Sequence, residues 1–402
     1  MAYLPLANIL HYRLRSALSA LGIGIGICML ITLGGLARGS LEEVADRWES
    51  VDADLIVLPR GWGEGAVDKS GSALSDKYAQ LILQRHGELV KLATPVFTWP
   101  IKLAGQDQLA VGIDPRDFEM FSGGRPVKGR LFDPDGRFAA WLEQVLLSPA
   151  DRQAQPLDLS AEDLARRGGL ELVIDKRLAR AGRYSLGQRV QTANHDWTIV
   201  GIVPEGVMSR VFLPRRTAQF LFGSGDITRS TLLFVKLRAG VDVGPAARRL
   251  AEDLKQDVVP LTAYRGMLHE RFGIMYLYVD AVNLLALVIA FLFIMVTLYM
   301  MVLQRTREIA ILKSSGASNA LLVRLVAVES LLLTSAGLAA GVALSFVAAW
   351  AIHAARPLLT VRITPGWVAT AAGMALAGSL AAAVFPAWRA TRVDMAEALS
   401  YE

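Results

Sequence analysis

The chain of 402 residues contains a single cysteine, Cys28, which lies inside a long uncharged run. A disulfide within one chain requires two cysteines, so no internal disulfide can stabilise any part of this protein. A domain outside the uncharged run must therefore fold around its own hydrophobic core, and a segment of about 240 residues is long enough to build one.

Signatures of catalysis are also scarce. The nearest approach to a phosphate-binding loop is GEGAVDKS at residues 63–70, where Asp68 stands in place of the glycine that precedes the lysine of such a loop. The histidines form no pair four residues apart and have no cysteine neighbours, and no Gly-x-Ser-x-Gly motif occurs. We therefore expect no catalytic residue, no metal site and no cofactor in this chain.

Lysine, arginine, aspartate and glutamate are absent from four stretches of 21 to 25 residues, at 17–37, 281–303, 330–352 and 364–388. Each stretch is long enough to cross about 30 Å of hydrocarbon as a helix. With a mean hydropathy of +0.38, they predict an α-helical membrane protein with four transmembrane helices. A cleaved signal peptide is the alternative for the first stretch, but no clear Ala-x-Ala site follows it, which favours an uncleaved anchor.

Basic residues flank these stretches unequally. The short loop between the last two spans contains two basic residues, Arg356 and Arg362. The short segments on the opposite side contain eight: Arg13, Arg15, Arg305, Arg307, Lys313, Arg324, Arg389 and Arg392. This bias predicts that both termini are cytosolic and that residues 38–280 are outside. Those residues include 32 basic and 32 acidic side chains, so the net charge of +5 reflects membrane topology and does not indicate nucleic-acid binding.

Residues 38–280 alternate between strand and helix patterns, which predicts a large α+β domain of two lobes inserted between helices 1 and 2. Strands are expected at 52–59, 94–105, 106–114 and 170–175, followed by a hairpin at 187–204 that turns near 193–195. Helical stalks are expected to about Ser50 and over 265–280, and the segments near the two ends of the domain should meet in the lobe nearer the membrane. The polar stretch 123–169 predicts an insertion or a mobile segment.

The N-terminal residues 1–16 are amphipathic and predict a helix that lies along the inner leaflet. The first span then carries small residues at Ala20, Gly22, Gly24 and Gly26. Such spacing lets two helix backbones approach closely, either in a dimer of two copies or against the other helices of the same chain.

The segment QRTREIAILKSSGAS, residues 304–318, opens a charged loop, 304–324, between the second and third spans. As a helix it places Ile309, Leu312 and Gly316 along one side, and an apolar stripe on a water-facing helix predicts a protein partner. Two carboxylates near the membrane, Asp280 and Glu329, would be functional candidates if they lay deep in lipid, but both lie at predicted span ends, which favours an interfacial position.

The runs RTREIAILKSSGAS, LLVRLVAVESLLLTSAGLAAG and PAWRATRVDMAEALSYE resemble the permease family of MacB, LolC and FtsX, as do GIDPRDFEMFSGGRPVKGRLF, LARAGRYSLGQRV and WTIVGIVP outside. The resemblance implies a MacB-like extracytoplasmic domain and a mechanotransmission-type ABC permease of the bacterial inner membrane, without a counterpart for residues 137–169. It also implies a separate cytosolic ATPase that binds ATP and Mg²⁺, and a second permease subunit. The residues implied in ATPase coupling are Arg305, Glu308, Ile309, Leu312, Lys313, Gly316 and Ala317, with Arg389, Arg392, Glu397 and Leu399 of the tail 389–402 near the same contact.

Three functions are open at this point. The first is a permease that exports or extracts a hydrophobic, peptide or lipoprotein-like substrate, with a periplasmic adaptor or substrate carrier as a further candidate partner. The second is an FtsX-like regulator that activates an extracytoplasmic partner such as a cell-wall hydrolase; the size of residues 38–280 favours the permease. The third is a stand-alone sensor or membrane enzyme, which predicts that no ATPase binds residues 304–318.

Overall fold

The computed structural model describes residues 13–61, 74–123, 127–147 and 161–392. The chain divides into two compact units. The helical unit comprises Met1–Leu41 and Gly273–Glu402, and the α+β unit comprises Glu42–Phe272. The predicted N-terminal interfacial helix lies almost wholly outside the described residues.

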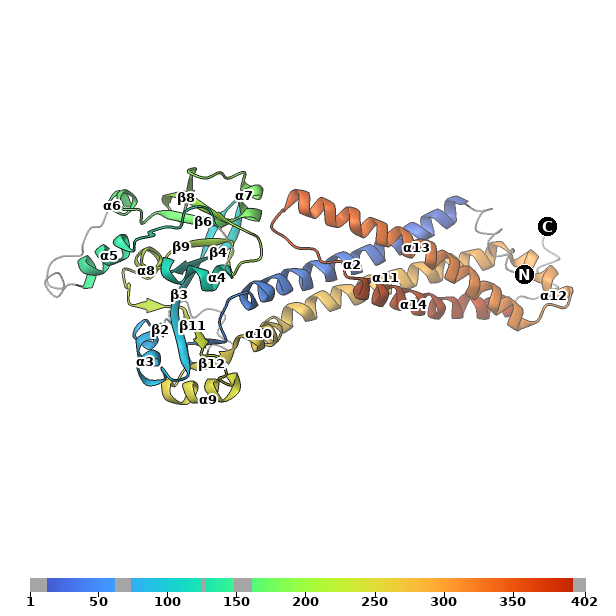
Figure 1. Ribbon diagram of the computed structural model, residues 1–402. Helices are drawn as coiled ribbons and strands as arrows, with labels where there is room; N and C mark the ends of the chain where they lie inside the picture. The colour runs from blue at the N-terminus through green and yellow to red at the C-terminus, as the bar shows by residue number, and fades with distance from the viewer. Residues whose placement is uncertain (1–12, 62–73, 124–126, 148–160, 393–402) are drawn as a thin grey trace. The chain divides into compact units, whose positions relative to one another are not determined.

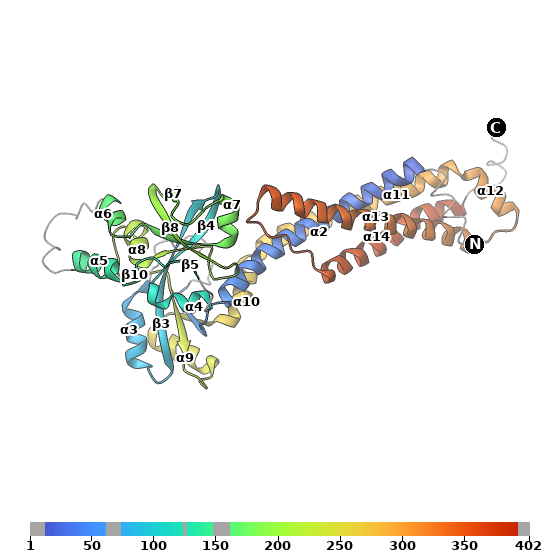
Figure 2. The same ribbon diagram turned by 45° about the horizontal axis from the view of Figure 1, so that its top comes forward.

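The helical unit is built from four long helices, each long and apolar enough to cross a membrane. They are α2 (Arg13–Glu49), α11 (Gly273–Gln304), α13 (Asn319–Ala355) and α14 (Pro365–Thr391), with the short α12 (Thr306–Ser314) between α11 and α13. The long helices run alongside one another (Figures 1 and 2). The predicted arrangement of one span, a large insertion and three further spans is confirmed.

Local sequence sets the ends of these helices. The hydroxyl of Ser318 accepts a hydrogen bond from the backbone N–H of Leu321, and Thr364 caps α14 in the same way, with Pro365 in its first turn. Helix α2 continues past the uncharged run to Glu49, as the stalk prediction required. The second predicted stalk is interrupted, because α10 (Tyr264–Arg271) ends at Phe272 before α11 begins.

The α+β unit contains a ten-stranded mixed sheet. Nine of its strands follow the order β12-β1-β11-β3-β4-β9-β6-β8-β5, and the tenth, β7, pairs with β8. Its strands are β1 (Leu55–Leu58), β3 (Val90–Leu103), β4 (Gln106–Ile113), β5 (Lys128–Gly129), β6 (Glu171–Asp175), β7 (Arg189–Thr192), β8 (His195–Val203), β9 (Val211–Pro214), β11 (Leu232–Leu237) and β12 (Asp257–Pro260). A separate small sheet pairs β2 (Leu74–Ser75) with β10 (Arg229–Ser230).

The long strand β3 belongs to both lobes of this unit (Figure 1). Its first half pairs with β11, from Val90 to Val96, and its second half pairs with β4, from Phe97 to Leu103. A single strand therefore carries the chain between lobes. The predicted meeting of the two ends of the domain is confirmed, because β1 pairs with β12 and β11.

Helices cover the sheet on its two faces. Helices α3 (Lys77–Arg85) and α9 (Val243–Leu254) lie beside the half of the sheet that contains β11 and β12 (Figure 1), and they bury Leu55 and Val57 of β1. On the other face, Ile56 and Leu58 pack into an aromatic-rich core with Trp48. Both faces of β1 are thus covered, which explains its uninterrupted apolar sequence. Further described helices of the unit include α4 (Phe118–Ser122), α7 (Lys176–Gly182), α8 (Arg215–Phe222) and two 3-10 turns, Pro115–Asp117 and Leu261–Ala263.

The stretch 123–169, predicted to be an insertion or a mobile segment, contains regular secondary structure. Its described residues include two helices, α5 (Arg137–Leu147) and α6 (Ala161–Arg166). Phe138 and Leu142, four residues apart on α5, are fully buried, and Leu164 of α6 is buried as well. Ala139, Ala140 and Trp141 lie between Phe138 and Leu142, so the sequence shows little polar-apolar contrast there, whereas the burial of one face stabilises the helix in the fold.

Candidate functional site

The short helix α12 contains four of the residues implied in coupling, Glu308, Ile309, Leu312 and Lys313. It follows α11 after a break at Arg305 and ends at Ser315, where Gly316 adopts a left-handed conformation with φ of +90°. The exposed Gly316 and the half-buried Ala317 therefore lie in the turn that leads into α13. The segment is helical and amphipathic, as its spacing indicates.

The apolar stripe of α12 faces the chain's own helices. Ile309 is buried and packs in one cluster with Val302, Leu322 and Val326 of α11 and α13. Leu312 is half-buried, whereas Ile311 on another side of α12 is 50% exposed. The spacing of apolar residues identifies an apolar face of a helix but not the segment that covers it. Ile311 is therefore a candidate for contact with a protein partner, although the spacing did not single it out.

Charged side chains hold α12 against both neighbouring helices. The Arg305 guanidinium donates to Glu308 at 2.7 Å and lies 3.9 Å from the carboxylate of Glu329 on α13. Lys313 donates to the backbone carbonyl of Thr391 at 2.8 Å, at the C-terminal end of α14, where a cation is favoured by the helix dipole. Movement of α12 would therefore act directly on α13 and α14.

The tail of α14 lies near this contact. Arg389 and Arg392 are both exposed, and the Arg392 guanidinium lies 4.2 Å from the ring centroid of Trp388. The structure thus brings these two arginines close to the end of α12 through the Lys313 contact. Glu397 and Leu399 lie outside the described residues, so their predicted role in coupling stays a prediction.

Glu329 is more enclosed than its sequence position indicates. Its side chain is only 5% exposed, and its position at the start of a charge-free run, which favours an interfacial location, gives no sign of this burial. With Arg305, Glu308 and apolar residues it lines a pocket of about 230 Å³. The full lining consists of Met301, Val302, Arg305, Glu308, Ile309, Ile311, Leu312, Leu325, Val326 and Glu329.

The small residues of α2 pack inside the chain. A side-chain carbon added at Gly22 would lie 2.5 Å from Phe293, one at Gly26 would lie 3.0 Å from Ala290, and one at Gly24 would lie 3.2 Å from the backbone of α13. One added at Gly337 would lie 3.0 Å from the carbonyl oxygen of Ala20. This is the alternative that the sequence left open, and pairing of two copies through these residues stays a prediction.

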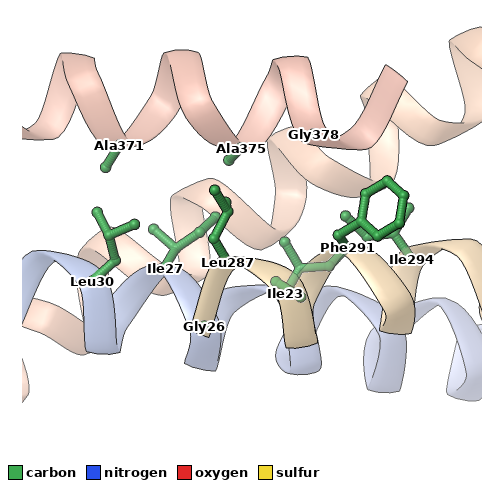
Figure 3. Close-up of a pocket in the computed structure, with 11 residues that line it drawn as sticks. Ile23, Gly26, Ile27, Leu30, Leu287, Phe291, Ile294, Ala371, Ala375 and Gly378 are labelled. Carbon is green, nitrogen blue, oxygen red and sulfur yellow. The ribbon is translucent and has the colours of Figure 1, made fainter. Parts of the chain in front are cut away.

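A second pocket, of about 20 Å³, lies between α2, α11 and α14 (Figure 3). Ala371 and Ala375 of α14 point toward Leu30 and Ile27 of α2 across it. Its lining is wholly apolar, and its volume is close to that of one water molecule. This space offers no polar path for a substrate.

In the α+β unit, the last turns of α2 are fixed by a buried ionic cluster. Glu43 accepts hydrogen bonds from Arg47 at 2.9 Å and from Arg210 at 2.7 Å, and lies 3.3 Å from Arg177. Arg47 also donates to Asp175, which is fully buried, at 3.2 Å. Burial raises the pKa of Asp175 and lowers that of Arg210. These bonds join α2 to β6, α7 and β9.

The opposite side of the same helical turns contacts α10. Arg265 donates to Asp46 at 2.7 Å and to Glu49 at 2.8 Å, and these bonds raise the pKa of Arg265. Trp48 stacks on Tyr264 with ring centroids 4.5 Å apart, and burial raises the pKa of the Tyr264 hydroxyl. Residues 43–49 of α2 therefore link the sheet of the α+β unit to α10, a connection between distant segments that no local pattern predicts. We call these residues the stalk junction.

Comparisons with known proteins cover nearly all of this chain. A family model for a MacB-like periplasmic core domain matches residues 16–253, and one for an FtsX-like permease C-terminal region matches residues 281–395. Among the described residues, no group of three or more histidine, cysteine or acidic side chains is placed to hold a metal ion.

Two curated relatives illustrate the similarity. A macrolide export ATP-binding/permease protein MacB of Burkholderia lata is 25% identical over 373 residues, which are 86% of this chain and 48% of the relative. A pyoverdine export ATP-binding/permease protein PvdT of Pseudomonas savastanoi is 27% identical over 355 residues, which are 83% of this chain and 49% of the relative. The chain thus spans about half the length of the curated relatives it matches. The crystal structure of the periplasmic region of MacB from Actinobacillus actinomycetemcomitans aligns with a TM-score of 0.36 at 16% identity, over 55% of this chain and 94% of that one.

Proposed function

This chain belongs to the MacB/FtsX family of ABC transporter permeases, and we propose that it works with a separate cytosolic ATPase to transmit ATP-driven motion to its extracytoplasmic domain. The observation that carries the proposal is the attachment of α12 to α13 through Arg305 and Glu329 and to α14 through Lys313. A force applied to α12 by a bound ATPase would reach both helices without an intervening flexible segment.

Motion reaches the α+β unit along α2 in this proposal. Helix α2 is continuous from Arg13 to Glu49, and its last turns form the stalk junction. The wholly apolar lining of the small pocket in Figure 3 favours work done on a substrate outside over passage of a polar substrate between the helices. We propose both termini to be cytosolic, and the working assembly to be a dimer of permeases with two ATPases.

The substrate that we propose is hydrophobic, peptide or lipoprotein-like and is exported or extracted at the extracytoplasmic domain. The names of the curated relatives, which refer to macrolide and pyoverdine export, support export as the broad class. An FtsX-like regulator of an extracytoplasmic partner is the second candidate, supported by the match of residues 281–395 to the FtsX-like model.

Docking is tested at Ile311. Ile311→Asp places a carboxylate in the centre of the proposed interface, where unpaired burial should weaken ATPase binding by about 2 kcal/mol or more, or about thirtyfold. The chain is purified with an affinity tag from its native membranes, and the copurified ATPase and its turnover are measured. Leu312→Asp is less informative, because Leu312 is half-buried, whereas Ile311 is 50% exposed, so a carboxylate at position 312 would perturb the packing of α12 itself.

Leu83→Asp is the matched control, since Leu83 is a comparably exposed apolar residue of α3 in the α+β unit. We expect it to leave ATPase copurification unchanged. Normal copurification and turnover with Ile311→Asp would exclude α12 as the docking element.

A further inference from the structure

The pocket beside α12 combines apolar walls with an excess of negative charge. Met301 and Val302 of α11, Leu312 of α12, and Leu325 and Val326 of α13 form its walls. Among the described residues, the ionisable side chains that line it are two carboxylates, Glu308 and Glu329, and one guanidinium, Arg305, which together carry a formal charge of −1. A pocket of this kind is complementary to a cation that is attached to an apolar body.

The position of Glu329 makes this charge unusual. A carboxylate on a membrane helix is costly to bury and commonly marks a site of function. The Arg305 guanidinium lies 3.9 Å from the Glu329 carboxylate, which is an ion-pair distance longer than a charge-assisted hydrogen bond. A small cationic group entering the pocket would gain from both carboxylates.

Neighbouring residues place the pocket at the level of lipid headgroups. Tyr299, one turn from the pocket on α11, contacts Phe385 with ring centroids 5.6 Å apart, and Trp388 follows on α14 beneath Arg392. Tyrosine and tryptophan collect at the membrane interface, where their polar atoms reach water. The charge-free run of α13 begins at Ser330, directly after Glu329.

Exposed apolar side chains lie beside the pocket residues in the sequence of the same helices. Met300 and Leu303 of α11 and Val323 of α13 are each more than 40% exposed, as expected for helix surfaces that face acyl chains. A ligand with an ammonium group and long hydrocarbon chains matches both the pocket and these surfaces.

We propose that this pocket binds the primary ammonium headgroup of an aminophospholipid. A primary ammonium has three N–H donors and can bond Glu308 and Glu329 together, whereas the quaternary ammonium of a choline lipid has none. The lipid phosphate carries the charge that Arg305 attracts. Bound lipid would join α11, α12 and α13, the helices at which we propose that force enters the membrane, but the site requires no ATPase.

The test uses the purified full-length chain without ATPase. It is stripped of endogenous lipid in detergent and then incubated with equimolar dioleoyl phosphatidylethanolamine and dioleoyl phosphatidylcholine, and retained lipids are counted by native mass spectrometry. We expect about a tenfold preference for the ethanolamine lipid, the effect of one charge-assisted hydrogen bond. The mono- and dimethylated ethanolamine lipids should fall between the two as donors are removed.

Glu329→Gln and Glu308→Gln should each abolish most of this preference, and Glu308→Gln serves as a second variant because its side chain is 56% exposed and tolerant of change. Glu252→Gln, an exposed position of α9, is the control and should leave the preference intact. Equal retention of the two lipids, or a preference that survives both pocket variants, would overturn the proposal.

Discussion

In the helical unit several helices approach one another closely at glycines, whereas in the α+β unit large aliphatic and aromatic side chains fill the interior. Gly341 of α13 lies against the backbone of α2 at Gly24, and Ser330 bonds the carbonyl of Ser379 between α13 and α14. The α+β unit instead buries Trp197, Phe121, Phe212 and Phe234 completely. Lipid is as apolar as a leucine side chain, so membrane helices gain from close van der Waals contact and polar bonds, while water drives large side chains into a core.

The two units also place charge differently. In the described part of the helical unit, ion pairs lie toward the ends of the long helices, where Arg38 lies 3.9 Å from Asp280 and Arg305 pairs with Glu308 and Glu329. The α+β unit buries an ionic cluster at the stalk junction and another around Asp76, which bonds Arg215 and Arg216 of α8. Buried charges require several partners each, and strands and helices from distant segments can supply them.

Removing a buried carboxylate should give the largest effect. Asp175→Ala deletes the partner of Arg47 and the cap on the Leu178 N–H of α7, and we expect a loss of about 3–5 kcal/mol from the α+β unit. Thermal unfolding of the full chain in detergent, followed by tryptophan fluorescence, measures this loss. Glu205→Gln removes a pair of which both side chains are largely exposed and should cost about 1 kcal/mol or less. Equal losses from the two variants would mean that the buried cluster is no more stabilising than a surface pair.

A smaller effect is expected from adding one methyl group to the helical unit. In Gly341→Ala the new carbon would lie 2.7 Å from the carbonyl oxygen of Gly24 and 2.8 Å from Ile27, and overpacking of this kind costs about 1–3 kcal/mol. Gly373→Ala on α14 is the control, because nothing lies within 4 Å of its added carbon. The thermal midpoints of both variants are measured in the same detergent and compared with that of the unchanged protein. A midpoint for Gly341→Ala that is not lowered would show that α2 and α13 are not held in close contact.

The smallest effect concerns a surface carboxylate of the α+β unit. Hydrogen bonds from His86 and Arg85 hold the pKa of Asp253 below its ordinary value of 3.8. Because the pKa of Asp253 is lower in the folded state than its ordinary value of 3.8, its carboxylate stabilises the folded state above pH 3.8. This stabilisation is lost as the pH falls through the folded-state pKa. Asp253→Asn should therefore show a flatter decline of the thermal midpoint below pH about 4 than the unchanged protein. Burial raises the pKa of Asp175, which acts in the opposite direction but is common to both proteins. Parallel declines of the two midpoints would exclude a contribution from Asp253.

Short-range patterns in the sequence were enough to determine several features. The four charge-free runs specify the four long helices, because a backbone in lipid must satisfy its hydrogen bonds within each segment. The turn near 193–195 follows from Ala193 and Asn194, which both adopt positive φ between β7 and β8. The spacing of residues 304–318 indicated an amphipathic helix, and α12 is one.

Other features depend on which distant segments meet, and only the tertiary structure decided them. The period of α12 could not reveal that Ile309 packs against α11 and α13 while Ile311 stays exposed. The sequence position of Glu329 does not show that its carboxylate is buried 3.9 Å from the Arg305 guanidinium. The pairing of β3 with β11, and the bonds that join Arg47 to Asp175 and Arg210 to Glu43, connect residues more than a hundred positions apart. A local pattern fixes the backbone hydrogen bonds and the apolar face of a segment, whereas the partner that covers this face is selected by packing across the whole fold.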